Sequence, residues 1–473
     1  MKRWSQLNSA IYGTKPSEEP PSIIRMKPRI LLVNPPVYDF SAYDFWLKPY
    51  GMLRVAGLLR GQAEFQLYDF MDRLDPRVPQ GIYRADEWGR GEFYSESIEK
   101  PAVFSNVPRR FRRFGLPRQT FEKFLSEDGP FDYALVQTGM TYWYPGVREV
   151  IDDIRAISPQ IKIVLGGVYA TLCASHARTL GADLVIEGSD LSPLWRFFSM
   201  TPQTDHLPLW DLYPHLKTGV LKLADGCPFH CTYCSVPQVY PKFRARPLDR
   251  SLAELEFLVR SGVNNVAFYD DALLFQPAQI IKPFLKATLR KGRDVNFHTP
   301  NALNARFVDR ELASLMINAS FKNIYLGFES SAYVWQKKTG GKVYSEELVR
   351  AVDCLVDAGA DPRRLRAYII VGHPLAGDQH VEESIHFANR LGIGVTLSEF
   401  SPIPGTSDGE ACRRWVNLDE PLCHNKTAFT FWSLGQTEVT RLKNAKAKYD
   451  YNFNMIKNKV KVGIEKMGVP RWA

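Results

Sequence analysis

Residues 220–234 read Val-Leu-Lys-Leu-Ala-Asp-Gly-Cys-Pro-Phe-His-Cys-Thr-Tyr-Cys, an apolar run that leads into three closely spaced cysteines. A short apolar run of this kind is typical of a buried strand. Three thiolates within eight residues, on the loop after a strand, can converge on one iron–sulfur cluster (Cys227, Cys231 and Cys234). Because three ligands for four irons leave one iron open, such a cluster can bind a substrate directly.

A structural zinc site is the alternative for these cysteines, but it needs a fourth ligand. His230 lies inside the loop, where its geometry is poor, and the sequence has no second CxxC pair or nearby His pair. The other four of the seven cysteines are scattered along the chain (Cys173, Cys354, Cys412 and Cys423). Cys354 lies in an apolar helical stripe and is expected to be a buried small hydrophobe.

Downstream of the cysteines, strands and helices alternate. The expected strands cover residues 220–224, 265–269, 295–298, 323–327, 366–372 and 395–400. Ser251-x-x-Glu254 predicts a capping box, and Asp309 and Ser345 are expected N-caps of later helices. This alternation over residues 218–410 predicts a partial (β/α)6 barrel, whose chemistry would lie on the loops after the strands.

Upstream of the cysteines, residues 28–195 show the same alternation, so we expect a doubly wound, Rossmann-like parallel sheet. The pattern is interrupted over 74–130, which is too long for an ordinary connection and indicates an insert. Aromatic residues of this insert, such as Trp88, are expected to pack against the sheet. A linker over 196–217, a loose N-terminal tail over 1–27 and a helical C-terminal region over 411–473 complete the α/β chain.

The composition is that of a globular protein: 473 residues, 45% hydrophobic, 23% charged, with a mean hydropathy of −0.24. It excludes a mostly disordered or membrane-embedded chain, and we expect no membrane span. Sparse cysteines indicate a reducing, cytoplasmic location. The net charge of +9 is concentrated at Arg109–Arg113 and between Lys443 and Lys466. Both clusters favour solvated faces of surface helices over polyanion binding, so nucleic acid is not an expected partner.

The spacing CxxxCxxC of Cys227, Cys231 and Cys234, with Tyr233 before the last cysteine, resembles the signature of the radical S-adenosylmethionine (radical SAM) superfamily. The resemblance implies a 4Fe-4S cluster whose open iron chelates S-adenosylmethionine (SAM). It also implies an external one-electron donor, such as flavodoxin or ferredoxin, and cleavage of SAM to a 5′-deoxyadenosyl radical.

Further motifs that resemble the superfamily follow successive expected strands. They are Phe268–Asp271, Phe297–Asn301, Gly327–Ser330, Tyr368–Pro374 and Ser398–Thr406. An acidic group suits the ammonium of the methionyl moiety, and the later strand ends would flank ribose and adenine. The resemblance thus implies SAM-binding roles for Phe229, Tyr233, Asp270, Asp271, His298, Glu329, Ser330, Gly372 and Pro402.

The first domain resembles the cobalamin-binding domain that precedes the barrel in one branch of this superfamily. The residues that would contact cobalamin lie at the expected strand ends: Pro35, Pro36, Gly139, Met140, Thr141, Gly166, Gly167, Tyr169, Ala170, Glu187 and Gly188. Ordinary tight αβ turns are the alternative reading of these glycines. One departure stands out, because Asn34 to Asp39 replaces the Asp-x-His-x-x-Gly loop whose histidine ligates cobalt in other cobalamin modules. Enzymes of this branch often lack that histidine.

Together these resemblances imply a cobalamin-dependent, class B radical SAM methyltransferase that acts on an unactivated carbon or phosphorus centre of a small-molecule or peptide substrate. The first alternative is a radical SAM cyclase, oxidase or rearrangement enzyme whose first domain binds no cobalamin. The second is an RNA-modifying protein. Methylthiotransferases of that kind carry three more cysteines upstream of the barrel, where this chain has only Cys173.

Overall fold

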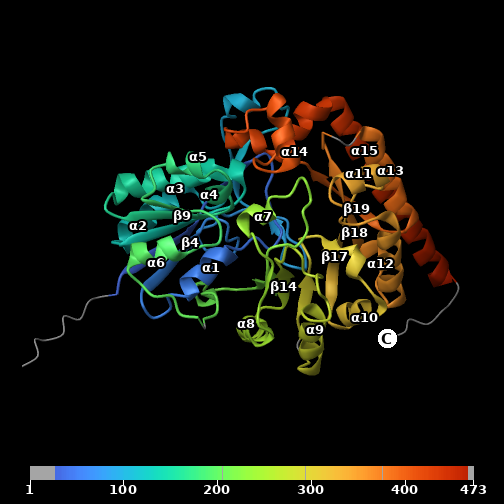
Figure 1. Cartoon of the computed structure of the whole chain (residues 1–473), viewed down its shortest axis with the longest axis horizontal. Coiled ribbons are helices and arrows are strands. Elements are labelled where there is room, and N and C mark those ends of the chain that lie inside the picture. Colours follow the sequence, from blue (N-terminus) through green and yellow to red (C-terminus); the bar gives the residue numbers. More distant parts are fainter. Residues whose placement is uncertain (1–26, 205, 293, 375–376, 467–473) are drawn as a thin grey trace, which may run out of the picture.

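The computed structural model describes residues 27–204, 206–292, 294–374 and 377–466. The expected N-terminal tail therefore lies outside the described residues, apart from Lys27. Two parallel sheets flanked by helices lie side by side, and part of the C-terminal region passes over the top of both (Figure 1). The predicted α/β class is confirmed.

The amino-terminal sheet has five parallel strands in the spatial order β4-β1-β8-β9-β10. These are β1 Arg29–Asn34, β4 Glu64–Asp69, β8 Tyr133–Thr138, β9 Lys162–Gly167 and β10 Leu184–Ile186. In chain order this is the 2-1-3-4-5 arrangement of doubly wound folds, whose strand order reverses between β1 and β8. Ligands of such sheets bind at that switch point, beyond the carboxyl ends of the strands.

Alternate residues of β1 belong to two different cores, because the strand is covered on both faces. Leu31 and Val33 face a core made within the amino-terminal domain. Ile30 and Leu32 belong to a larger core that is continuous with the second domain. The helices of this domain are α1 Tyr50–Gly57, α2 Arg118–Asp128, α3 Tyr144–Ile157, α4 Val168–Leu172, α5 Ala174–Arg178 and α6 Ser192–Phe198.

The expected insert contributes three strands to two small antiparallel sheets, in the order β2-β7-β6 and β3-β5, in which β2 and β3 come from the segment after β1. Their strands are β2 Val37–Asp39, β3 Tyr43–Asp44, β5 Gly91–Glu92, β6 Ser95–Ser97 and β7 Arg112–Phe114. The inserted segment ends earlier than residue 130, because α2 is the crossover helix between β4 and β8 and packs on α3. The expectation that Arg109–Arg113 is a solvated helix face is wrong: Arg113 lies in β7, is buried, and pairs with Glu149 at 2.7 Å.

The second sheet has six parallel strands in chain order, as expected for a partial barrel. They are β11 Thr218–Leu221, β14 Asn265–Phe268, β15 Asn296–His298, β17 Phe321–Glu329, β18 Leu365–Val371 and β19 Gly394–Glu399, with β16 Leu303–Asn304 beside β17. Within the described chain β19 does not pair with β11, so the sheet is open. The larger helices are α8 Leu248–Arg260, α9 Ile281–Arg290, α10 Arg310–Asn318, α12 Ser345–Asp357 and α13 Asp378–Arg390, and the short ones are α7 Val236–Val239, α11 Tyr333–Lys338 and α14 Ser407–Glu410.

One of the three predicted helix starts is confirmed, a second is displaced by one residue and the third is wrong. Asp309 caps α10, and its carboxylate accepts a hydrogen bond from the Leu312 amide at 2.7 Å. Ser345 is the first residue of α12 rather than its cap. The predicted capping box of Ser251 and Glu254 is wrong, because α8 already begins at Leu248 and both residues are buried inside it.

The C-terminal region does not form a separate solvated tail. Residues 421–428, which include the first turn of α15 Lys426–Lys466, contact both domains. Helix α15 bends at Gly435, where φ is 76°. His424 Nδ1 lies 3.0 Å from Thr141 Oγ1, and Asn425 donates to Asp39 at 3.0 Å, both in the amino-terminal domain. Thr427 donates to Glu399 at the end of β19 at 2.6 Å. This segment therefore ties the first sheet to the last strand of the second.

No helix in the described part of the chain is both long enough and apolar enough to cross a membrane.

Candidate active site

The three cysteines lie on one loop at the carboxyl end of the second sheet. The loop leaves β11 through a short hairpin in which β12 Ala224–Asp225 pairs with β13 Arg244–Ala245. Gly226 follows with φ of 81°, and a Cβ there would lie 2.8 Å from the Lys242 carbonyl oxygen, so the turn requires glycine. Cys227, Cys231 and Cys234 are all half-buried and free of disulfides.

The three thiols of the loop interact electrostatically. Burial raises the pKa of each thiol, that of Cys234 to about 11. The Cys231 thiol further raises the pKa of Cys227 and that of Cys234. Within the described ranges, no three Cys, His, Asp or Glu side chains come close enough to hold a single metal ion.

Lys342 places a positive charge beside this loop. No motif in the sequence identified this lysine as a site residue. Its Nζ lies 3.4 Å from Glu329 Oε1 at the end of β17. Burial lowers the pKa of Lys342, but the neighbouring Glu329 and the thiols of Cys231 and Cys234 outweigh this and raise it. The absence of a side chain at Gly327 makes room for the ammonium, because a Cβ there would lie 3.1 Å from Lys342 Nζ. A cation next to the cysteine loop favours thiolates and binds anionic ligands.

The far side of the loop is supported by a row of hydrogen-bonded side chains. The Tyr233 ring stacks on Trp335 with centroids 6.0 Å apart, and Trp335 donates to His373 Nδ1 at 3.3 Å. His373 Nε2 lies 2.9 Å from Asp408 Oδ2, which also accepts from Thr232 Oγ1 at 2.5 Å. Thr232 follows Cys231 directly, so Asp408 fixes the loop between two of its cysteines.

The two aspartates after β14 do different things. Asp270 accepts hydrogen bonds from the amides of Leu223 and Ala224 at 2.9 and 2.7 Å, so its carboxylate holds the chain that leads into the loop. Burial raises its pKa to about 7. Asp271 is half-exposed, and Lys222 Nζ lies 3.5 Å from its carboxylate. Asp271 is therefore the one of this pair that is turned toward open space.

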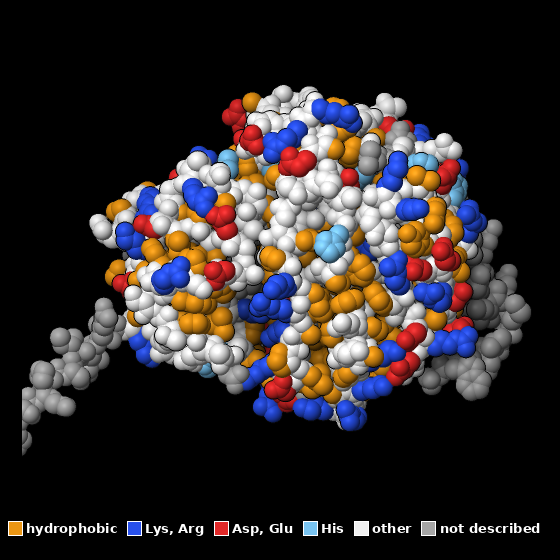
Figure 2. Space-filling model, viewed as in Figure 1, with side chains coloured by type: hydrophobic (Ala, Val, Ile, Leu, Met, Phe, Trp, Pro, Cys, Tyr) orange, Lys and Arg blue, Asp and Glu red, His pale blue; other side chains and the backbone are white. Residues whose placement is uncertain are grey.

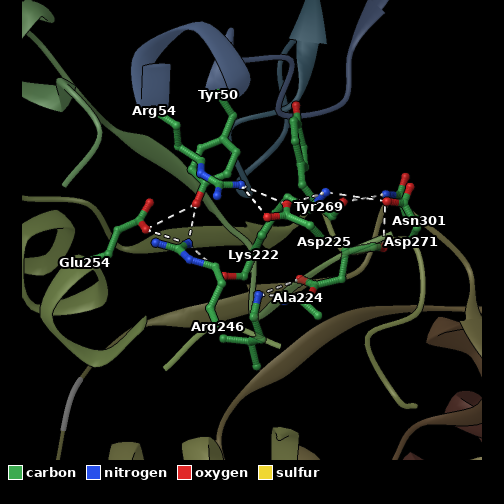
Figure 3. Close-up of polar contacts among 12 residues, drawn as sticks. Tyr50, Arg54, Lys222, Ala224, Asp225, Arg246, Glu254, Tyr269, Asp271 and Asn301 are labelled. Atoms are coloured by element: carbon green, nitrogen blue, oxygen red, sulfur yellow. Dashed lines mark hydrogen bonds and ion pairs between the residues drawn. The ribbon is translucent and has the colours of Figure 1, made fainter. Parts of the chain in front are cut away.

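Figure 3 shows a polar network that reaches the same chain segment from the amino-terminal domain. Arg54 of α1 donates from Nη1 to both carboxylate oxygens of Asp225, at 2.8 and 3.0 Å. Arg246 pairs with the fully buried Glu254 at 2.9 Å and donates to Tyr50 of α1 at 2.6 Å. Glu254, read from the sequence as a capping residue, instead anchors this network. No sequence signal identified Arg54 or Arg246.

Other expected SAM-binding residues are engaged within the protein. His298 is completely buried and stacks on Trp46 at 4.3 Å, with Nε2 2.9 Å from Asn265 and Nδ1 3.0 Å from Asn323. Burial lowers its pKa to about 3. Trp88 of the insert packs on the same ring, at 5.6 Å, so this part of the insert covers the second sheet, whereas Phe104 and Phe111 of the insert belong to the core of the first domain, as expected.

The remaining members of the expected SAM set lie around the loop. Ser330 is buried and accepts from the Ala332 amide, while Pro402 is buried. Gly372 has φ of 79° and lies so close to α15 that a Cβ would meet Thr430 Oγ1 at 2.7 Å. Phe229 makes ring contacts with Phe275 and Phe307 at 6.0 Å each. These half-exposed rings belong to the loops of the second domain, where Figure 2 shows hydrophobic side chains gathered in the middle of the face.

The expected cobalamin residues divide into an open group and a buried group. Met140 is 47% exposed, and Gly139, Gly166, Gly167, Glu187 and Gly188 are exposed or half-exposed. Pro35, Pro36, Thr141, Tyr169 and Ala170 are buried. The open group lies at the carboxyl ends of β8, β9 and β10, near α7, whose Val239 carbonyl oxygen is 4.0 Å from a Cβ built on Gly188.

The buried group is committed to internal contacts. Thr141 meets His424, Tyr169 hydrogen-bonds His176 at 2.6 Å, and the Ala170 amide donates to Thr138 at 3.0 Å. Gly167 has φ of 120°, and a Cβ there would lie 2.3 Å from the Thr138 carbonyl oxygen, so this glycine is required by the fold itself. The open group alone fits a ligand at the sheet edge.

These features define an α/β chain in which a doubly wound domain precedes a second parallel sheet, and the cysteine loop lies at the carboxyl end of that second sheet. Residues 221–388 match the family model described as the Radical SAM superfamily. The match begins in β11 and includes the cysteine loop.

Solved structures extend the likeness to both domains. The radical SAM methyltransferase TsrM from Kitasatospora setae, solved with cobalamin and a [4Fe-4S] cluster bound, superposes with a TM-score of 0.61 at 14% identity, covering 85% of each chain. The cobalamin-dependent radical enzyme OxsB, solved with aqua-cobalamin and SAM bound, gives 0.53 at 13% identity and covers 89% of this chain and 61% of that chain. At these identities the likeness shows the fold. The resemblance found in the sequence is thus confirmed.

Curated relatives match less than half of the chain. An uncharacterised methyltransferase of Pyrococcus horikoshii is 26% identical over 210 residues, which cover 42% of this chain and 44% of that protein. The ribosomal protein uS12 methylthiotransferase RimO of Chlorobium phaeobacteroides is 27% identical over 184 residues, covering 38% and 42%. The chain thus spans less than half of the length of these relatives.

Proposed function

We propose that this radical SAM protein is a cobalamin-dependent methyltransferase that acts on an unactivated carbon or phosphorus centre. The observation that carries the proposal is the arrangement of the three cysteines, which share one loop at the carboxyl end of the second sheet. The adjoining α7 lies beside the carboxyl edge of the first sheet. A 4Fe-4S cluster supplies one electron that cleaves SAM to methionine and a 5′-deoxyadenosyl radical, and cobalamin supplies a methyl carrier.

The donor set of the loop fits such a cluster. Cys227, Cys231 and Cys234 provide three sulfur ligands and leave the fourth position to SAM. Lys342 lies within electrostatic reach of all three thiols, so it favours their deprotonated, ligating form. Its ammonium also suits the carboxylate of SAM, while the half-exposed Asp271 suits the amino group.

The open group at the first sheet edge would hold cobalamin, with Gly139, Met140 and Gly166 at the ends of β8 and β9 as its nearest contacts. Backbone without bulky side chains lets a flat macrocycle approach the strand ends. The described structure has no histidine in the turn after β1, where Asn34 donates to Asp69 at 2.6 Å, so no residue of that turn supplies an imidazole to cobalt.

The decisive experiment is anaerobic reconstitution followed by analysis of bound cofactors and products. We expect about four irons and four sulfides per chain, bound corrinoid in the visible spectrum, and both 5′-deoxyadenosine and S-adenosylhomocysteine from SAM. Protein that binds neither iron nor sulfide after reconstitution would contradict the whole proposal. Replacement of the three cysteines by alanine is the matched control and should abolish the cluster.

A second candidate is a radical SAM reaction without cobalamin, such as cyclisation, oxidation or rearrangement. One observation favours it: Thr141, expected to contact cobalamin, is instead hydrogen-bonded to His424. In that case reconstituted protein retains no corrinoid, and SAM yields 5′-deoxyadenosine without S-adenosylhomocysteine. The substrate in either case would be a small molecule or peptide, and an external protein such as a flavodoxin or ferredoxin would donate the electron.

A further inference from the structure

We infer that Arg54, on helix α1 of the amino-terminal domain, is a positioning residue for the cysteine loop and for Asp271. The inference rests on the proposed function, because it concerns the site where the cluster and SAM would lie. It assigns to the first domain a part in shaping the SAM site of the second.

The chain of contacts begins at the ion pair between Arg54 and Asp225. The guanidinium donates to both carboxylate oxygens, at 2.8 and 3.0 Å, and Asp225 stands two residues before Cys227. The start of the cysteine loop is therefore held by a group from another domain.

Lys222 links Asp225 to Asp271. Its buried ammonium lies 3.3 Å from Asp225 and 3.5 Å from Asp271, so one cation is shared between two carboxylates (Figure 3). While Arg54 neutralises Asp225, Lys222 remains available to Asp271. Without Arg54, Asp225 has Lys222 as its nearest cation, and we expect Lys222 to shift toward it and away from Asp271.

Helix α1 is itself anchored, so the position of Arg54 is well defined. Tyr50, at the start of the helix, accepts from Arg246 at 2.6 Å and donates to Glu254 at 3.2 Å. Arg246 also donates to the Lys222 carbonyl oxygen at 2.8 Å. Helix α1 is thus connected to residues 222–225 directly by Arg54, and through Arg246 by Tyr50.

The placement of the Arg54 pair indicates a role beyond stability. The Arg54 and Asp225 side chains are 33% and 20% exposed, and partly exposed ion pairs contribute little to the free energy of unfolding. Yet this pair is the first of a series of ion pairs that leads from Arg54 through Asp225 and Lys222 to Asp271, beside the cysteine loop. An effect on SAM binding with little effect on unfolding is what a positioning role predicts.

The test compares Arg54→Met and Arg54→Lys with the wild type after anaerobic reconstitution. We expect Arg54→Met to keep its iron content, because all three ligands remain. The KM for SAM in reductive cleavage should rise about tenfold, and the change that SAM causes in the electron paramagnetic resonance signal of the reduced cluster should weaken. Arg54→Lys keeps the charge but loses the paired hydrogen bonds, so it should recover part of the affinity.

Arg60→Met is the matched control. Arg60 follows α1 closely and pairs with Asp211 at 2.6 Å, away from the loop, so its loss should leave the KM for SAM and the spectrum unchanged. Asp225→Asn removes the carboxylate that would draw Lys222 away from Asp271, so adding it to Arg54→Met should restore part of the affinity for SAM. If Arg54→Met binds SAM as the wild type does, the inference is overturned while the proposed function stands. A wild type that binds no cluster overturns both.

Discussion

Lys342 and Glu329 form an ion pair 3.4 Å long at the carboxyl end of β17, beside the cysteine loop. Glu329 sits in the left-handed region with φ of 70°, which costs about 1–3 kcal/mol for a residue other than glycine. Such strain is retained where the surroundings over-determine it, and here the carboxylate is aimed at the lysine. We therefore treat the pair as one unit of the site.

Replacing Lys342 by methionine should weaken SAM binding without releasing the cluster. The substitution removes the ammonium that suits the SAM carboxylate and keeps the apolar stem. A rise of about tenfold in the KM for SAM is expected, measured by 5′-deoxyadenosine formation. Lys338→Met, an exposed position nearby in sequence, is the control and should behave as wild type. Unchanged affinity in Lys342→Met would remove this lysine from the SAM site.

Gly327→Ala tests the position of the Lys342 ammonium, because it adds a methyl group next to that ammonium. A methyl group there would lie 3.1 Å from Lys342 Nζ, and the flexible end of a lysine can move by the few tenths of an ångström required. We expect the free energy of unfolding to change by less than about 1 kcal/mol, while SAM affinity falls. Stability is measured by chemical denaturation and affinity by the KM for SAM. If both fall to the same extent, the substitution has damaged β17 as a whole.

The strands and the cysteine loop could be predicted because their signals are local. Each apolar run is bounded by a turn, and the spacing of Cys227, Cys231 and Cys234 is contained in eight residues. Asp270 and Asp271 look equivalent in the sequence, and only the fold shows that the amides of Leu223 and Ala224 occupy the first of them.

The charged residues that contact the loop could not be predicted, because they lie in segments that are far from the loop in the sequence. Arg54 stands 171 positions before Asp225, and neither residue belongs to a recognisable pattern. Glu254 illustrates the opposite error: a local pattern with Ser251 suggested a helix cap, whereas burial against Arg246 and Tyr50 decided its role. His298 likewise matched a motif but is enclosed by Trp46.

His298→Ala should lower stability and leave SAM binding unchanged. The substitution removes a stacked ring from a fully buried position and leaves the side chains of Asn265 and Asn323 without their partner. A loss of about 3 kcal/mol in the free energy of unfolding is expected. A large rise in the KM for SAM with little loss of stability would restore the SAM-binding role that the motif implies.

Asp270→Asn should remove a pH dependence of stability near neutrality. The pKa of Asp270 is raised to about 7 by burial, from about 3.9 in an unfolded chain. A raised pKa gives a stabilising contribution that is complete below pH 3.9 and is lost as the pH rises through about 7. Between pH 5 and pH 7 the wild type should therefore lose about 2 kcal/mol relative to the variant. Parallel stability curves from urea denaturation would contradict this.

Asp408→Asn should loosen the cysteine loop. Its effect on the free energy of unfolding should not change with pH over the neutral range. Asp408 accepts from Thr232 and His373, and these contacts lower its pKa although burial alone raises it. A lowered pKa gives stability that is present above about pH 3.9 and lost as the pH falls through the folded value.

The Asp408→Asn variant should therefore be less stable than the wild type by about 1–2 kcal/mol at every pH from 8 to 5, with the difference shrinking only below about pH 4. Because the neutral amide is a weaker acceptor for Thr232 than the carboxylate, we also expect iron to leave the reconstituted variant faster in the presence of a chelator. Asp419→Asn, an exposed position of the same C-terminal region, is the control. A stability difference that disappears between pH 7 and pH 5 would show that Asp408 titrates in that range and is not held charged by its two partners.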